Sequence, residues 1–382
     1  MQGTKMEYKK INELTTVVTG GTPSTRKNEY WDNGDIPWLQ SGCCQNCDVD
    51  STEKYITKEG YNNSSTHMMS ADTVMIALTG ATAGKVGYLK FEACGNQSIT
   101  GILPCESLNQ RYLFFYLLSQ REKILADCVG GAQAHISQSY VKNMTIPILA
   151  IKEQEQIVGE LTKVSNIVSL RQEEIQQLDN LVKARFVEMF GDCTNMISLS
   201  ELCLIITDGT HQSPKFQHDG IPFILVSNLS KNTVTYDTDK FISAETYKEL
   251  YKRTPIEIGD ILLSTVGSYG HPAVVVEDRK FLFQRHIAYL KPKSDILNSY
   301  YMHGALLSPG CQRQIEEKVK GIAQKTLNLS EIRKIRIPVS SLDLQKQYAD
   351  FVHQVNKSKV AVQKALDETQ ILFDSLMQKY FG

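Results

Sequence analysis

The stretch "RFVEMFG" at residues 185–191 decides how this chain is organised, because residues 376–382, "LMQKYFG", read as a second copy of it. Sliding the sequence along itself extends the match through both halves and keeps its order, with an offset that grows from 185 to 191 residues. The matching pairs are Ile36-Pro37 with Ile221-Pro222, Gly80 with Gly267, Gln97 with Gln284, Gln133 with Gln324, Ile146-Pro147 with Ile337-Pro338, Gln154 with Gln345, and Phe190-Gly191 with Phe381-Gly382. A repeat of this kind indicates two similar units in tandem.

The first part of each unit has the texture of a mixed domain. Residues 1–150 and 193–340 combine short β-branched runs with helical stretches, and glycine, proline and asparagine bound the runs. We expect strands at 73–78, 260–266 and 335–339, and helix at 111–125. The sequence therefore predicts an α/β fold with two tandem α/β heads.

The second part of each unit is helical. Residues 151–192 and 341–382 contain almost no glycine or proline, and their apolar positions follow a heptad. The candidate seam residues are Leu161, Val164, Val168, Ile175, Leu178 and Val182 in the first segment, and Val352, Val355, Val362, Leu366, Phe373 and Leu376 in the second. Two unrelated helices, each packed on its own head, would also fit one such run. Because an equivalent run follows each head, the pattern favours an antiparallel coiled coil and a pseudo-twofold internal repeat.

Composition narrows the class of protein. At 42% hydrophobic, the 382 residues suffice for two or three cores. No apolar run reaches the roughly 18 residues of a membrane helix, and the first residues lack the apolar core of a signal peptide, so we expect a cytoplasmic protein without a membrane partner. Nine cysteines, an odd number, fit reduced thiols better than a disulfide framework. With a net charge of −1, any affinity for nucleic acid would require local basic patches or a basic partner.

Motifs for catalysis and cofactor binding are incomplete. "TGATAGKVG" at 79–87 has too few residues between its glycines for a phosphate loop, and valine follows its lysine. The pair Cys44 and Cys47 is half of a zinc site without a second half. The eight histidines stand at no diagnostic spacing from a serine or an aspartate. We therefore predict no catalytic residue, no metal site and no cofactor in this chain.

Polar loops stand at equivalent places in both heads and carry different side chains. Arg, Lys, Asn and Gln form bidentate contacts with base edges in the major groove, and Ser and Thr bind either kind of partner. The candidate DNA-binding residues are Ser24, Thr25, Arg26, Lys27, Thr79, Thr82, Lys85, Gln97 and Ser98 in the first head, and His211, Gln212, Lys215, Ser268, Tyr269, His271, Gln284, Arg285 and His286 in the second. This pattern suits two readers of two different sequences.

These motifs together resemble the specificity subunit of type I restriction-modification systems. The resemblance rests on "TGGTPS" and "YWDNGDIPWL" in the first head, on "DGTHQSPKF", "GIPFILVSNL" and "FQRHIAYLKP" in the second, and on "GKVGYL", "IPILAIKEQEQIV" and "RFVEMFGD". It covers essentially the whole chain.

The resemblance implies that the heads are target recognition domains, each reading one half of a bipartite site in double-stranded DNA. It implies that the helices set the spacing and dock two methyltransferase subunits, and that restriction subunits complete the complex. S-adenosylmethionine, ATP and Mg²⁺ are then expected on the partner subunits, and this chain is expected to be non-catalytic by itself. A two-headed scaffold that holds protein partners without DNA is the alternative that the repeat and the heptads leave open.

Overall fold

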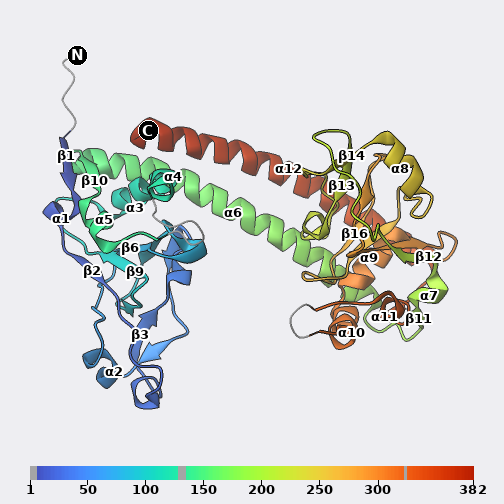
Figure 1. The fold of residues 1–382 in the computed structure, drawn as a ribbon, viewed down its shortest axis with the longest axis horizontal. Coiled ribbons are helices and arrows are strands. Elements are labelled where there is room, and N and C mark those ends of the chain that lie inside the picture. Colours follow the sequence, from blue (N-terminus) through green and yellow to red (C-terminus); the bar gives the residue numbers. More distant parts are fainter. Residues whose placement is uncertain (1–6, 128–134, 322–324) are drawn as a thin grey trace. The chain divides into compact units, whose positions relative to one another are not determined.

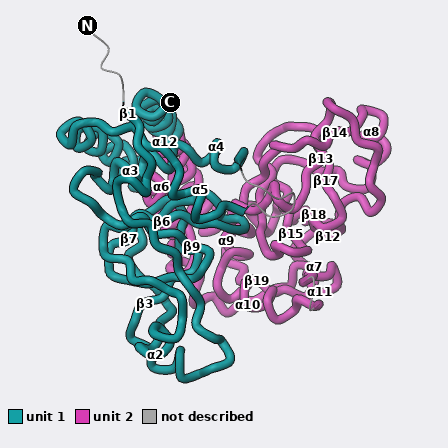
Figure 2. Tube along the Cα trace, turned by 60° about the vertical axis from the view of Figure 1, so that its left-hand side comes forward, with its two compact units in different colours: residues 1–170, 366–382 teal, residues 171–365 magenta. Residues whose placement is uncertain are grey.

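The computed structural model of the chain describes residues 7–127, 135–321 and 325–382, so the repeat pair Gln133 and Gln324 lies outside the described residues. The chain forms two compact units (Figures 1 and 2). Unit 1 comprises Met1–Leu170 and Leu366–Gly382, and unit 2 comprises Arg171–Ala365. Each unit therefore contains one head and a part of each long helix. The predicted boundaries at residues 150, 192 and 340 stay predictions.

Unit 1 holds three small sheets, with strand orders β2-β9-β6-β7-β4, β5-β3-β8 and β1-β10. The strands are β1 (Glu7–Lys10), β2 (Val17–Thr19), β3 (Ile36–Leu39), β4 (Cys47–Val49), β5 (Tyr55–Ile56), β6 (Val74–Ala77), β7 (Val86–Leu89), β8 (Cys94–Gly95), β9 (Ile99–Ile102) and β10 (Thr145–Ile148). The short helices are α1 (Ile11–Leu14), η1 (Asn28–Tyr30), η2 (Ser41–Cys43), α2 (Lys58–Asn62), η3 (Gly80–Thr82), α3 (Gln110–Ser119), α4 (Arg121–Ala126) and α5 (Gln138–Asn143).

Unit 2 repeats this plan, with strand orders β12-β18-β15-β16, β14-β13-β17 and β11-β19. The strands are β11 (Met196–Ser198), β12 (Cys203–Asp208), β13 (Ile221–Ile224), β14 (Phe241–Ile242), β15 (Ile261–Ser264), β16 (Pro272–Val274), β17 (Leu282–Phe283), β18 (Ile287–Pro292) and β19 (Arg336–Pro338). The short helices are α7 (Leu199–Leu202), η4 (Val226–Leu229), α8 (Ala244–Tyr251), α9 (Ser299–Leu307), α10 (Pro309–Lys318) and α11 (Leu329–Ile332). Among the described residues, the edge strand β4 of unit 1 has no counterpart here.

The three expected strands correspond to β6, β15 and β19. The expected helix at 111–125 is instead two helices, α3 and α4, which meet at Gln120. Gln120 ends α3 because its ψ of 1° departs from helical geometry. Its backbone N–H donates to the carbonyl oxygens of Tyr116 and Leu117. The hydroxyl of Ser119 also donates to the Tyr116 carbonyl at 2.7 Å. These bonds satisfy carbonyls at the end of the helix and let the chain turn.

The two long helices are α6 (Ile151–Phe190) and α12 (Leu342–Phe381). Within unit 1, the hydroxyl of Tyr380 donates to Glu160 of α6. Within unit 2, Lys359 Nζ lies 2.5 Å from Asp179 Oδ1, and the Tyr348 hydroxyl donates to the Val182 carbonyl at 3.4 Å. In unit 2 the residue numbers fall along one helix as they rise along the other, so α6 and α12 pair antiparallel there.

The proposed seam residues lie along this contact. All twelve are buried or half-buried, and Leu161 is fully buried. Most residues between them are exposed, Val360 at 70%. Lys359 follows the seam residue Val352 by one heptad, and its charge is satisfied by an ion pair with Asp179 on the facing helix.

Both long helices are fixed to a head at each end. At the start of α6, the buried side-chain oxygen of Gln154 accepts from the backbone N–H of Asn109 at 2.8 Å. At the start of α12, the buried side-chain oxygen of Gln345 accepts from the backbone N–H of Asn298, also at 2.8 Å. At the end, Phe190 of α6 packs on Tyr301 in unit 2, with ring centroids 4.8 Å apart. Phe381 of α12 packs on Tyr112 in unit 1, at 5.3 Å. The Phe-Gly ending occurs twice because the helix that follows each head ends with a phenylalanine that packs into the core of the other head.

Candidate nucleic-acid interface

Three polar loops come together in each head because they border neighbouring strands. In unit 1, Gly21 of the first loop donates to Gly95 at 2.7 Å, and Leu78, before the glycine turn, donates to Ser98 at 2.8 Å. In unit 2, Thr210 donates to Phe283 at 3.0 Å, and Thr265 donates to His286 at 2.9 Å. The backbone thus assembles the candidate residues 24–27, 79–85 and 97–98 into one region of head 1. Residues 211–215, 268–271 and 284–286 are assembled likewise in head 2.

Two hydrogen-bonded turns lie at the centre of this arrangement. Turn 1 (residues 96–99) is closed by the bond from Ile99 N to Asn96 O, and turn 2 (residues 284–287) by the bond from Ile287 N to Gln284 O, both 3.1 Å long. A glycine packs against each of them. A Cβ atom on Gly20 would lie 2.0 Å from Asn96 O, and one on Gly209 would lie 2.3 Å from Phe283 O. Only glycine permits this approach of two backbones.

The backbone pairing corrects one sequence match. The sequence pairs Gln97 with Gln284, but Asn96 N donates to Leu39 O where Gln284 N donates to Ile224 O. Because Leu39 and Ile224 end the equivalent strands β3 and β13, Asn96 is the counterpart of Gln284. The central residues of turn 1, Gln97 and Ser98, therefore correspond to Arg285 and His286 of turn 2. The match between Gln97 and Gln284 was wrong by one residue, because the glutamine of head 1 stands one position later in the turn than the glutamine of head 2.

The glycine turns after β6 and β15 have the same backbone. Gly80 and Gly267 each have a φ of 72°, in the left-handed region that favours glycine. The side chains on these turns are different and are largely held by the protein. Lys85 Nζ donates to Gln45 at 2.7 Å, and His271 Nδ1 lies 3.0 Å from Asn232 Oδ1. Thr79 and Thr82 are half-buried, and Thr82 donates to the Thr79 carbonyl at 3.4 Å.

Tyr269, on the glycine turn of head 2, is also engaged. Its hydroxyl donates to Glu316, which Lys325 contacts at 2.9 Å. The Tyr269 hydrogen bond, followed by that from Lys325, lowers the pKa of Glu316. Ser268 on the same turn is exposed.

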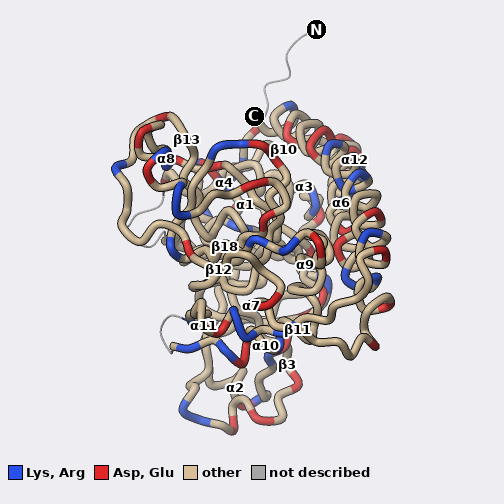
Figure 3. The backbone as a smooth tube through the Cα atoms, turned by 90° about the vertical axis from the view of Figure 1, so that its right-hand side faces the viewer, with Lys and Arg blue, Asp and Glu red and all other residues tan. Residues whose placement is uncertain are grey.

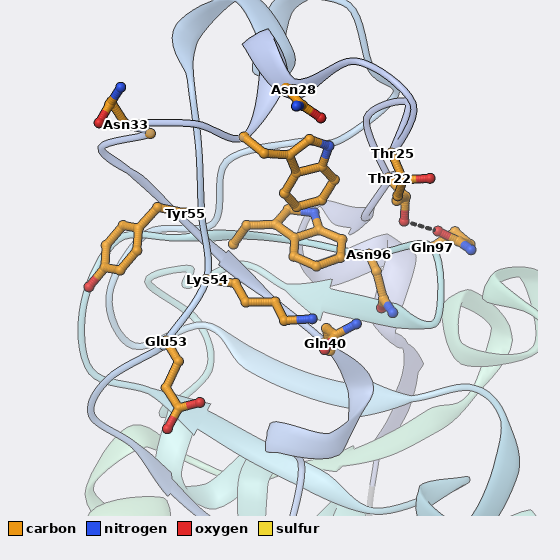
Figure 4. Close-up of a pocket in the computed structure, with 13 residues that line it drawn as sticks. Thr22, Thr25, Asn28, Asn33, Gln40, Glu53, Lys54, Tyr55, Asn96 and Gln97 are labelled. Atoms are coloured by element: carbon orange, nitrogen blue, oxygen red, sulfur yellow. Dashed lines mark hydrogen bonds between the residues drawn. The ribbon is translucent and has the colours of Figure 1, made fainter.

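The first loop of head 1 borders a cavity of about 790 Å³ (Figure 4). An edge-to-face pair of indoles, Trp31 and Trp38, lines it, with ring centroids 5.0 Å apart. The candidates Thr25 and Gln97 line it. The other polar or aromatic residues that line it are Thr22, Asn28, Asn33, Gln40, Glu53, Lys54, Tyr55 and Asn96. Amide, hydroxyl and aromatic groups therefore face one cavity, which is the chemistry of base recognition.

Head 2 carries the counterpart of this aromatic pair. Phe216 and Phe223 have the same spacing of seven residues and ring centroids 5.3 Å apart, and Lys240 Nζ lies 5.4 Å from the Phe216 ring. The shared spacing is the signal that could have identified the pair from sequence. Arg285 and His286 line a separate cavity of about 440 Å³ together with Asp208.

The remaining candidate side chains differ in exposure and in whether they already have a hydrogen-bond partner in the protein. Ser24, Arg26, Gln212 and Lys215 are exposed. Lys27 Nζ donates to the Tyr30 hydroxyl at 2.9 Å, and this hydrogen bond raises the pKa of Lys27.

In head 2, His211 Nε2 lies 2.9 Å from Asp208, a carboxylate that Arg253 also contacts at 2.9 Å. The sequence analysis missed both of these partners.

Charges of both signs alternate along the long helices (Figure 3). In the described part of the chain, no cluster of three or more His, Cys, Asp or Glu side chains is arranged to hold a metal ion. No helix among those residues has the length and hydropathy to cross a bilayer.

Known proteins share both the sequence and the fold. The family "Type I restriction modification DNA specificity domain" matches twice, at residues 4–180 and 194–369. The chain is 32% identical over 170 residues to the EcoR124I/EcoR124II specificity subunit of Escherichia coli, a match that covers 43% of this chain and 42% of that protein. It is 22% identical to the MjaIX specificity subunit of Methanocaldococcus jannaschii over 98% of this chain and 92% of the relative.

Two solved structures share the fold. One is a type I restriction-modification S subunit from M. genitalium, with a TM-score of 0.54 and 16% identity over 100% of this chain and 98% of that one. The other comes from work on complex assembly and conformational transition of the type I system, with a TM-score of 0.53 and 17% identity over 99% and 98%. The predicted α/β fold of two tandem domains is confirmed, and specificity is favoured over the scaffold alternative. This chain belongs to the type I restriction modification DNA specificity family.

Proposed function

We propose that this chain selects the DNA target of a type I restriction-modification complex, each head reading one half of a bipartite site. The observation that carries the proposal is one loop frame, present twice, with different side chains at equivalent positions. Equal backbones give both heads the same approach to a duplex, and different side chains give them different base preferences. In this proposal α6 and α12 set the distance between the half-sites, since a 40-residue helix extends about 60 Å at about 1.5 Å per residue.

The proposal assigns affinity and chemistry to partner subunits. A chain with a net charge of −1 releases few counterions from the phosphate backbone, which supplies most non-specific affinity. Two methyltransferase subunits, docked on the long helices, would clamp the duplex and bring S-adenosylmethionine. Restriction subunits would bring ATP and Mg²⁺. The heads would contribute discrimination of about 1–3 kcal/mol for each well-read base pair.

Modified-base sequencing tests this proposal in host DNA, with and without the gene for this chain and with the methyltransferase partner left intact. Loss of one bipartite adenine-methylation motif on deletion is the expected result. A methylome that stays unchanged, although the system is expressed, would contradict a role in target selection and favour the scaffold alternative.

A further inference from the structure

The two turns present different recognition chemistry at one structural position. Gln97 in turn 1 and Arg285 in turn 2 are the first central residues of turns with matching hydrogen bonds, and both side chains are exposed. A glutamine amide pairs with the N6 and N7 edge of adenine, whereas a guanidinium pairs with O6 and N7 of guanine. The position therefore carries adenine chemistry in one head and guanine chemistry in the other.

Arg285 is held in an orientation that leaves its outer edge available. Its Nε donates to His286 Nε2 at 3.2 Å, so the terminal nitrogens Nη1 and Nη2 remain as a pair of parallel donors. Burial, aided by the charge of Arg285, lowers the pKa of His286, which favours the neutral imidazole that can accept a hydrogen bond. Asp208 lines the same cavity, and its carboxylate is paired with His211 and Arg253 rather than with Arg285.

Gln97 is oriented by a hydroxyl from the neighbouring loop. The Thr22 hydroxyl donates to Gln97 Oε1 at 2.5 Å at the edge of the indole-lined cavity (Figure 4). Oε1 keeps a second lone pair, and both hydrogens on Nε2 are available. The amide can therefore accept from adenine N6 and donate to adenine N7 at the same time.

We infer that Gln97 and Arg285 are equivalent base selectors, Gln97 for an adenine in one half-site and Arg285 for a guanine in the other. The inference rests on the proposed function, since it presumes that both heads read DNA. Thr22 and His286 act as positioning residues. The two half-sites should then differ at matching places by A in one and G in the other.

The test uses the full chain in complex with its methyltransferase subunits, once the motif is known. Each purine of the motif is replaced, one at a time, by its 7-deaza analogue, which lacks only the N7 acceptor. One guanine replacement should weaken binding by roughly 10- to 150-fold in the wild type, because it removes one of the two hydrogen bonds to a charged guanidinium and leaves the bond to O6. It should have no effect in the Arg285→Ala chain. Arg313→Ala, which removes an exposed arginine from α10, is the matched control and should keep the dependence on N7.

Reciprocal and positioning variants complete the test. Gln97→Arg should shift the preference at the matching place in the other half-site from adenine to guanine. His286→Phe should reduce discrimination between guanine and 7-deazaguanine, whereas a purely structural role would weaken binding to both duplexes alike.

A wild type that is indifferent to every 7-deaza replacement overturns the inference. So does a loss of binding by the Arg285→Ala chain that is equal on all duplexes, which a phosphate contact would produce. In both cases the proposed function stands, whereas a wild-type complex that leaves no bipartite methylation motif overturns the proposed function.

Discussion

Head 1 and head 2 share a backbone and differ in what that backbone presents. The order β2-β9-β6-β7 recurs as β12-β18-β15-β16, and the glycine at the start of each candidate loop makes the same close approach to the following turn. Head 1 has the additional strand β4 and a pair of indoles, whereas head 2 has a pair of phenyl rings. In head 2, His211 and Arg253 contact Asp208, which lines one cavity with Arg285. Positions that set the path of the chain are kept in both copies, and positions that face solvent on the loops are free to differ.

The largest effect should follow from making the heads identical. When residues 1–150 are replaced by a second copy of residues 193–340, both ends of the target should be read by the same loops. Sequencing of modified bases should then show a symmetric motif built twice from the half-site of head 2. The reciprocal chain, with two copies of head 1, is the control and should give the other half-site twice. A change in both halves to new sequences would contradict independent reading.

A second change alters the distance between the heads and leaves both unchanged. Seven residues inserted into α6 after Leu170 and seven into α12 before Leu366 preserve the heptad and the antiparallel register. Each added heptad lengthens a helix by about 10 Å, which corresponds to roughly three base pairs at 3.4 Å per step. The gap in the methylation motif should grow by that amount. Insertion into α6 alone breaks the register and should abolish methylation, and an unchanged gap would exclude the helices as the ruler.

Stability should distinguish the two copies of the Phe-Gly ending. Phe190 is 3% exposed and contacts Phe186, Tyr301 and Tyr348, with ring centroids 4.8 to 5.9 Å apart. Its replacement by alanine should lower the free energy of unfolding by about 3–5 kcal/mol. Phe381 is only partly buried, so Phe381→Ala should cost less, roughly half as much. Urea denaturation of the full chain measures both changes, and Val360→Ala, at a 70% exposed position, should be neutral. Equal losses would contradict the difference in burial.

Much of this fold could be predicted because the repeat constrains it twice. Gln154 and Gln345, or Phe190 and Phe381, stand out in sequence since each pair performs one structural task that tolerates little change. The break of α3 at Gln120 was missed, since apolar residues continue on both sides and the helix is buried nearly all round.

The candidate site was harder to predict. Residues such as Lys85 and Tyr269 look available in sequence, but their partners Gln45 and Glu316 lie 40 and 47 positions away. The correspondence between Gln97 and Arg285 could not be predicted, because Gln284 stands next to Arg285 and gives an identical match to Gln97.

The smallest expected effect comes from a test of whether the glycine turns have the same backbone energy in both heads. Gly80 and Gly267 have an equal φ of 72°, and a Cβ on either would meet no atom within 4 Å. Alanine at each position therefore pays only for the left-handed backbone, about 1–2 kcal/mol of unfolding free energy, and the two losses should agree. Gly310→Ala is the matched control, since Gly310 lies in α10 with open space around its Cβ and alanine favours a helix. That variant should be neutral or more stable. Unequal losses at Gly80 and Gly267 would mean that the loops, and not only their side chains, differ in energy between the heads.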